Sequence, residues 1–198
     1  MASYLIEGKP SRTYARTKAL MLGDPNLWFG LLDRLADLAI ASLRSQIEAG
    51  VQAVQIFDSW AGALSPSVYE QYVLPASKKV FTEIADLDVP RIHFGVGNGE
   101  ILQLMANAGS DVMGIDWRIP LDEARRRLGQ NSILQGNLDP AVCLAPIEVV
   151  DIAVNDILNI NAGHPGHIFN LGHGVLPETD PGVLKHIVEV VHAYEIQS

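Results

Sequence analysis

The stretch RIHFGVGNGEILQLMANAGSDVMGIDW (residues 91–117) contains the repeat that decides the fold. Its first part, RIHFGV (91–96), is short and apolar, which is typical of a strand buried on both faces. GEILQLMANAG (99–109) has the length and apolar spacing of a helix that ends at a glycine, and DVMGIDW (111–117) is a second apolar strand. The spacing therefore predicts a strand, a crossover helix and a second strand parallel to the first.

The same alternation continues on both sides of this unit. Toward the amino terminus, the sequence predicts a helix from Asp24 and Pro25 to Gly50, a strand in VQAVQIF (51–57) and a helix from Ser65 and Pro66 to about Ala85. Toward the carboxyl terminus, it predicts helices at 120–129 and 146–159, strands in SILQGNLDP (132–140) and GHIFNLGHG (166–174), and a last helix that begins at Asp180 and Pro181. Strands and helices thus alternate along most of the chain.

Parallel strands with helical crossovers form either an open doubly wound sheet or a closed (β/α)8 barrel. The barrel is favoured because the strands end in polar or glycine-rich residues and because GVGNG (95–99) lacks the spacing of a nucleotide-binding GxGxxG motif. A complete barrel has eight strands in about 250 residues, and this chain of 198 residues is shorter. We predict an α/β fold, a single partial (β/α)8-barrel domain over 1–198 that is incomplete at its amino-terminal side. Residues 1–23 are expected to be a loop that joins an absent strand to the first helix.

Composition and charge exclude several classes of function. A net charge of -9 disfavours nucleic acid as a partner, although Arg125 to Arg127 form one basic run, which we expect to be a solvated helix end. A single cysteine, Cys143, excludes a disulfide framework and is expected to be buried. The amino terminus lacks a secretory signal, and the apolar stretch 27–47 contains four charged residues, so that no membrane span is expected. These features predict a cytoplasmic location.

Candidate functional residues follow the predicted strands. Because the carboxyl ends of parallel barrel strands form one edge, where barrel enzymes carry their sites, these residues are expected to lie together. They are Asp58, Ser59, Trp60, residues 95–98, Asp116, Trp117, Asn137, Asp139 and His173. His173 can exchange a proton near neutral pH, and its flanking glycines permit a ligand to approach closely. The alternative is a histidine that only contacts neighbouring loops.

Other kinds of site fit the residues less well. His164, His167 and His173 lie close in sequence but at opposite ends of a predicted strand, so that no metal site is expected. FDSWAG (57–62) lacks the GxSxG pattern of a serine hydrolase. Tyr14 is expected to pack against apolar surface, whereas Trp60 and Trp117 either face a planar ligand or fill loops.

Several longer strings share one resemblance. They are SYLIEG (3–8), QIEAGVQAVQIFDSWAGALSP (46–66), GIDW (114–117), QGNLDP (135–140) and GHIFNLGHGVLPETDP (166–181). Together they resemble the uroporphyrinogen decarboxylase family over essentially the whole chain. The resemblance implies a (β/α)8-barrel carboxy-lyase, usually a homodimer, that converts uroporphyrinogen III into coproporphyrinogen III by removing four acetate carboxylates, without metal or organic cofactor. It also implies that Tyr4, Ser59 and His173 contact the porphyrinogen substrate.

The chain also departs from this family. The catalytic aspartate and the arginines of an RQAGRY-type motif come from amino-terminal segments of family members, and neither is present, so that no catalytic residue is expected in this chain. An acidic chain needs positioned arginines to bind an octacarboxylate. We therefore expect the isolated chain to be inactive and to expose apolar sheet edges. GKPS (8–11) replaces a glycine-richer stretch, which affects the shape of that loop.

Two alternatives to the decarboxylase remain. A zinc-dependent corrinoid-linked methyltransferase shares the barrel, but its histidine and cysteine ligands are lacking, because Cys143 lies in DPAVCLAP (139–146) and does not follow a strand directly. The other alternative is a non-catalytic fragment that serves as the assembly partner of a separate amino-terminal half.

Overall fold

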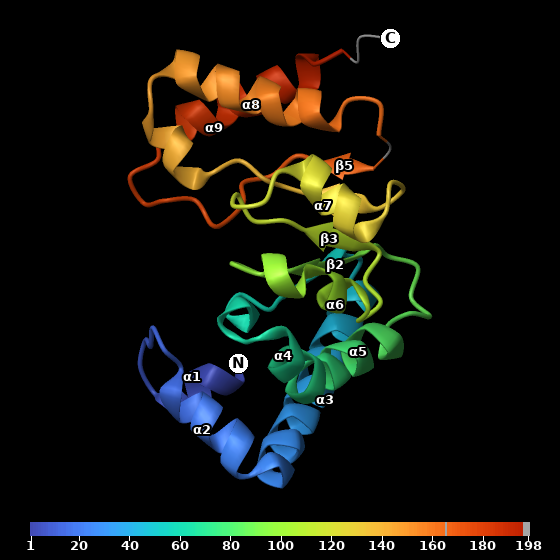
Figure 1. Ribbon diagram of the computed structural model, residues 1–198. Helices are drawn as coiled ribbons and strands as arrows, with labels where there is room; N and C mark the ends of the chain where they lie inside the picture. The colour runs from blue at the N-terminus through green and yellow to red at the C-terminus, as the bar shows by residue number, and fades with distance from the viewer. Residues whose placement is uncertain (165, 196–198) are drawn as a thin grey trace.

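A computed structural model of the chain describes residues 1–164 and 166–195, in which strands and helices alternate (Figure 1). The strands are β1 (Val54–Phe57), β2 (Arg91–Phe94), β3 (Val112–Gly114), β4 (Ile133–Gln135) and β5 (His167–Ile168). They form one sheet in the order β1-β2-β3-β4-β5, and all neighbours are parallel. A doubly wound sheet reverses its strand order at a switch point, whereas a barrel does not. The sequential order therefore confirms a segment of a (β/α)8-type barrel.

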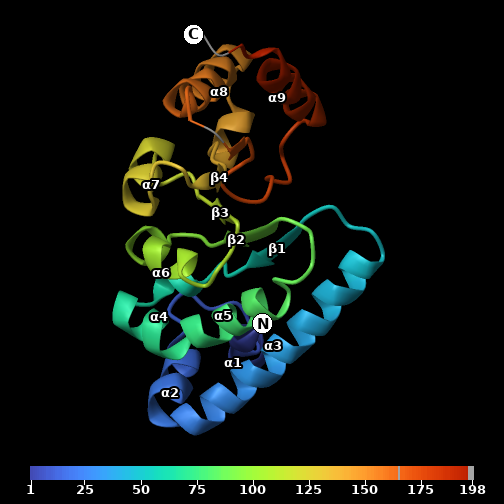
Figure 2. The same ribbon diagram turned by 90° about the vertical axis from the view of Figure 1, so that its right-hand side faces the viewer.

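Helices connect the strands and cover one face of the sheet, as α6 and α7 show in Figure 2. The helices are α1 (Ala2–Glu7), α2 (Ala15–Gly23), α3 (Pro25–Glu48), α4 (Pro66–Tyr72), α5 (Leu74–Glu83), α6 (Leu102–Ala106), α7 (Leu121–Leu128), α8 (Ile147–Asn161) and α9 (Pro181–Ala193). Asp24 caps α3 by accepting a hydrogen bond of 3.1 Å from Leu27 N, as the sequence predicts. Within the described residues, none of these helices has the length and apolarity to cross a bilayer.

The sheet is curved toward its uncovered face. Gln135 Nε2 on β4 donates a hydrogen bond of 3.1 Å to Gln55 Oε1 on β1, although β2 and β3 lie between these strands. In a flat sheet, strands three places apart are separated by about 14 Å, too far for two glutamine side chains that stand upright on it. On the opposite face, Met113 and Leu134 are buried in a cluster with residues of α6 and α7. The concave face thus corresponds to the interior of a barrel.

The amino-terminal prediction was wrong. Residues 1–23, expected to be a loop, contain the two helices α1 and α2. Both are stabilised by packing, because Ala2, Met21 and Trp28 bury their side chains together between α1, α2 and α3. Short helices gain most of their stability from such tertiary contacts, which a local pattern does not reveal.

Three further boundaries differ from the prediction. The helix expected from Ser65 to about Ala85 is divided at Val73, because Pro75 lies in the first turn of α5 and cannot continue the preceding helix. The strand expected at 51–57 begins at Val54. The strand expected at 166–174 is reduced to β5 and an isolated bridge between Leu138 and Leu171.

Arg125 is not a solvated helix end, so this prediction was wrong for one of three arginines. It is 1% exposed and donates to Gln130 O at 3.1 Å, to Ser132 O at 2.7 Å and to Asn161 Oδ1 at 2.6 Å. Arg126 and Arg127 both pair with Glu123, at 2.5 and 2.6 Å. Arg125 therefore connects α7, the loop before β4 and the end of α8. Cys143 is buried, as expected.

Candidate functional site

The predicted polar residues do gather at the carboxyl edge of the sheet. Asp58 follows β1, Asp116 follows β3, Asn137 follows β4 and His173 lies in the segment after β5. Asp139 has a different role, because its carboxylate accepts a hydrogen bond of 2.9 Å from Ala141 N and caps a short 3-10 helix (Pro140–Leu144). The edge carries two separate groups of side chains, one at β1 and the other at β3 and β5.

The first group is an aromatic cluster at the end of β1. The ring of Trp60 lies 4.3 Å from that of Tyr4 and 5.2 Å from that of Tyr14, measured between centroids. Ser59 precedes Trp60 and is partly exposed. The structure thus brings two of the three predicted substrate contacts, Tyr4 and Ser59, to one place. Tyr14 packs on Trp60, which agrees with the sequence-based expectation for Tyr14.

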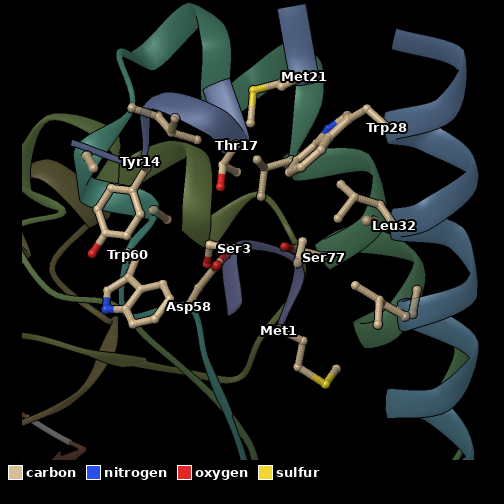
Figure 3. A pocket seen from close by; sticks show the side chains of 18 of the residues that line it. Met1, Ser3, Tyr14, Thr17, Met21, Trp28, Leu32, Asp58, Trp60 and Ser77 are labelled. Atoms are coloured by element: carbon tan, nitrogen blue, oxygen red, sulfur yellow. The ribbon is translucent and has the colours of Figure 1, made fainter. Parts of the chain in front are cut away.

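A cavity of about 200 Å³ opens beside this cluster, between β1, α1, α2, α3 and α5 (Figure 3). Its walls are largely apolar and include Met21, Trp28 and Leu32. Its polar side chains include Ser3, Thr17, Lys18, Asp58 and Ser77, and Tyr14 and Trp60 lie at one end. His173 does not line this cavity. An apolar cavity with a few convergent polar groups has the composition of a binding site for an organic ligand.

Two buried polar side chains lie behind Asp58. His93 on β2 is fully buried, its Nδ1 lies 3.2 Å from Met105 O, and its Nε2 lies 3.7 Å from Asp58 Oδ2. Because a carbonyl only accepts, Nδ1 carries a proton. Tyr69 is also fully buried, and burial, followed by the charge of Asp58, raises the pKa of its hydroxyl. The sequence analysis missed both residues, because each occupies an apolar position of a strand or helix.

The second group is built on Asp116, whose carboxylate is fully buried. It accepts hydrogen bonds from Gly97 N, from Arg118 N at 2.9 Å and from Arg118 Nη1 at 2.8 Å. Asn137 Nδ2 donates to Asp116 O at 2.9 Å and to Ile119 O at 2.6 Å. These bonds fix both ends of the loop 116–119 and join it to the segments that follow β2 and β4.

His173 lies against this loop. Its ring is 6.0 Å from that of Trp117 in an edge-to-face arrangement, and the Arg118 guanidinium carbon lies 3.8 Å from the centroid of Trp117. Of the two glycines that flank His173, Gly172 has a steric reason, because a Cβ at this position would lie only 2.5 Å from Trp117 N. The sequence analysis did not identify Arg118, although an arginine that follows the Asp-Trp pair of a strand end was the available signal.

Among the residues that the structure describes, no three histidine, cysteine, aspartate or glutamate side chains form a group that could hold a metal ion. His167 Nε2 lies 2.7 Å from Gly136 O, and burial lowers its pKa. His173 instead faces Trp117. The two histidines therefore take part in separate contacts.

Sequential parallel strands with their polar residues at the carboxyl edge define a (β/α)8-barrel protein of the kind that carries enzyme sites. The family model described as "Uroporphyrinogen decarboxylase (URO-D)" matches residues 1–194, and the chain belongs to this family. The "Uroporphyrinogen decarboxylase" of Streptomyces coelicolor is 60% identical over 192 residues, which are 97% of this chain and 54% of the relative. That of Nocardia farcinica is 58% identical over 197 residues, with 97% and 56% covered. The chain thus spans about half the length of these relatives.

A solved structure, "methyltransferase from Methanosarcina mazei", is also similar, with a TM-score of 0.68 and 19% identity over 78% of this chain and 46% of that one. At this identity the likeness shows the fold alone. The methyltransferase alternative therefore gains support for its barrel and none for its chemistry.

Glu7 holds the helix that carries Tyr4 in place. Its Oε1 accepts hydrogen bonds of 2.9 Å from Thr17 N and from Thr17 Oγ1. The bond from Thr17 N–H is the main reason why the pKa of Glu7 is lowered. A carboxyl group whose pKa is lowered by folding stabilises the folded state at pH values above its pKa in the unfolded chain. This stabilisation is lost as the pH falls through the pKa of the folded state.

We expect the near-ultraviolet circular dichroism of the Tyr4–Trp60 pair to change in an acid titration below about pH 4.5, before global unfolding. In Glu7→Gln, which carries no titrating group at this site, the signal should not depend on pH in this window. Glu48→Gln, on the exposed end of α3, serves as the control. Identical titrations of the wild-type chain and Glu7→Gln would show that Glu7 does not hold α1.

Proposed function

We propose that the chain forms the carboxyl-terminal part of a uroporphyrinogen decarboxylase, in which Tyr4, Ser59 and His173 contact the porphyrinogen. The observation that supports this most directly is the match to the family over residues 1–194. The geometry agrees with it, because the aromatic cluster at β1 and the His173 group at β3 and β5 lie on the same edge of one curved sheet. A wide macrocycle with carboxylates around its rim is a ligand that can contact two such groups at once.

The proposed reaction uses the substrate as its own electron sink. A pyrrole ring of the porphyrinogen first takes up a proton and becomes positively charged. The bond between the acetate CH₂ and its carboxylate then breaks, carbon dioxide leaves, and the bonding electron pair moves into the ring. Protonation of the exocyclic carbon gives the methyl group, and loss of the first proton restores the pyrrole. In this scheme the chain binds and orients carboxylates by hydrogen bonds from Tyr4, Ser59 and His173.

We further propose that turnover requires strands in addition to the five described. Within the described residues, the outer edges of β1 and β5 have no strand partner. Phe57 on β1 is 67% exposed and Ile168 on β5 is 42% exposed. Unpaired edges with exposed apolar side chains favour pairing with further strands. A homodimer, a cytoplasmic location, the lack of a cofactor and the lack of nucleic acid binding stay predictions.

The test compares the chain alone, the chain with the amino-terminal part of the Streptomyces coelicolor relative, and a chimera in which this chain replaces the matched segment of 192 residues in that relative. Anaerobic uroporphyrinogen III is the substrate, and mass spectrometry follows the loss of carboxylates. We expect turnover only in the completed forms. Turnover by the chain alone would contradict the need for further strands, and a folded chimera without turnover would contradict the decarboxylase proposal.

His173→Gln in the active chimera tests the site itself. Removing a hydrogen bond to a charged group costs about 1.5–3 kcal/mol, so we expect kcat/KM to fall by about 10- to 150-fold. His192→Gln, on α9, is the matched control and should leave kcat/KM unchanged. If His173→Gln retains the wild-type kcat/KM, His173 does not contact the substrate.

A further inference from the structure

We propose that Arg118 is a carboxylate-binding residue of this site, next to His173. The inference rests on the proposed function, because it concerns how the same site recognises a substrate with many carboxylates. Arg118 and His173 are both in contact with Trp117, the guanidinium on the ring face and the imidazole at the ring edge. One indole at the carboxyl edge thus contacts both a permanent cation and a histidine.

The position of Arg118 is fixed from several directions. Asp116 accepts hydrogen bonds from both the backbone N and the Nη1 of Arg118, at 2.9 and 2.8 Å. Asn137 holds both ends of the same loop. A guanidinium that is stacked on an aromatic ring and held by a carboxylate loses little further freedom when it binds a ligand. The loop is therefore built to present Arg118 in one orientation.

Arg118 remains accessible despite these contacts. Its side chain is 50% exposed, whereas that of Asp116 is fully buried. The guanidinium has five N–H donors in a planar fork, and its hydrogen bond to Asp116 uses Nη1. The Asp116 carboxylate does not occupy the whole guanidinium, because it also accepts hydrogen bonds from the backbone N atoms of Gly97 and Arg118. The exposed part of the fork suits a second carboxylate, which comes from the ligand.

The charge of the chain gives this arginine particular importance. The net charge of -9 opposes the approach of any polyanion. At the β3 and β5 end of the edge, Arg118 introduces a permanent positive charge next to the Trp117 ring that His173 also contacts. We infer that Arg118 contributes to binding of the substrate more than to the chemical step, and that its contribution grows with the number of carboxylates on the ligand.

The experiment uses the full-length chimera and the variants Arg118→Gln and Arg118→Lys. Arg126→Gln is the matched control, since Arg126 is 71% exposed and pairs with Glu123 on α7. We expect Arg118→Gln to raise KM for uroporphyrinogen by about 10- to 100-fold with kcat changed less than twofold. The rise should be smaller for partially decarboxylated substrates. Arg118→Lys should recover part of the affinity, because it keeps the charge without the fork, and Arg126→Gln should match the wild type.

Equilibrium binding separates this inference from the proposed function. The oxidised octacarboxylate, uroporphyrin, is titrated against tryptophan fluorescence at two salt concentrations. Weaker binding with a smaller salt dependence in Arg118→Gln supports the inference even if the chimera shows no turnover, a result that would contradict only the proposed function. An unchanged KM and unchanged binding in a folded Arg118→Gln would overturn it. If that variant does not fold, Arg118→Met, which can still pack on Trp117 but carries no charge, takes its place, and wild-type KM and binding in Arg118→Met at both salt concentrations overturn the inference equally.

Discussion

Asp116→Ala is expected to lower the free energy of unfolding by about 2–5 kcal/mol. The substitution leaves two backbone donors, Gly97 N and Arg118 N, without their buried acceptor, and each such loss costs about 1–3 kcal/mol. In a chain of this size the melting temperature should fall by about 5–15 °C. The same change should remove most activity from the chimera, because the loop that places Trp117, Arg118 and His173 loses its anchor.

Thermal and urea unfolding, with activity measured in parallel, check this expectation. Asp116→Asn keeps one acceptor oxygen and the shape of the side chain, so its effect should be intermediate. Asp122→Ala, on the exposed surface of α7, is the matched control and should change stability by less than about 0.5 kcal/mol. A wild-type melting temperature for Asp116→Ala would show that the loop 116–119 is held by Asn137 alone.

Arg125→Ala is expected to have the largest effect on stability, about 3–5 kcal/mol, because a large buried side chain and several buried hydrogen bonds are lost. The substitution removes the guanidinium that donates hydrogen bonds to Gln130 O, Ser132 O and Asn161 Oδ1. It also leaves a void in place of a fully buried side chain. Arg125→Met should cost less, because it fills most of the void and lacks only the polar contacts. Urea denaturation gives the comparison through the shift of the midpoint at constant slope.

Arg126→Ala, one residue further along α7, is the control for charge. Its pairing with Glu123 is exposed, and exposed pairs contribute about 0–1 kcal/mol. Equal losses of stability in Arg125→Ala and Arg126→Ala would contradict the structural role that burial assigns to Arg125.

The series of strands could be predicted from the sequence because each strand is a short apolar run bounded by glycine or proline. That information is local. Residues 1–23 were misread because α1 and α2 depend on contacts with Trp28 on α3. Arg125 was misread for a related reason, since its acceptors Ser132 and Asn161 lie on other elements. No pattern within α7 distinguishes the buried arginine from its neighbours.

The site was predicted in part. Strand ends and the resemblance identify Tyr4, Ser59 and His173 as candidates, and the structure shows that Tyr4 and Ser59 share the β1 cluster while His173 joins Trp117. The place of Arg118 after the Asp-Trp pair of a strand end makes it a candidate, but the sequence does not show whether it stacks on an indole or extends into water. His93 escaped notice because its neighbours are apolar and its partner Asp58 comes from another strand.

The sequential strand order has a consequence for how the chain folds. Each pairing in the described sheet joins two strands that are consecutive along the chain, so that it closes a single strand-to-strand crossover. Proteins whose contacts are close in sequence fold faster than those that join distant segments. The cross-sheet bond between Gln55 and Gln135, by contrast, joins residues 80 positions apart and needs four strands in place. We therefore expect this bond to form after the pairings of neighbouring strands, and to report when the sheet acquires its curvature.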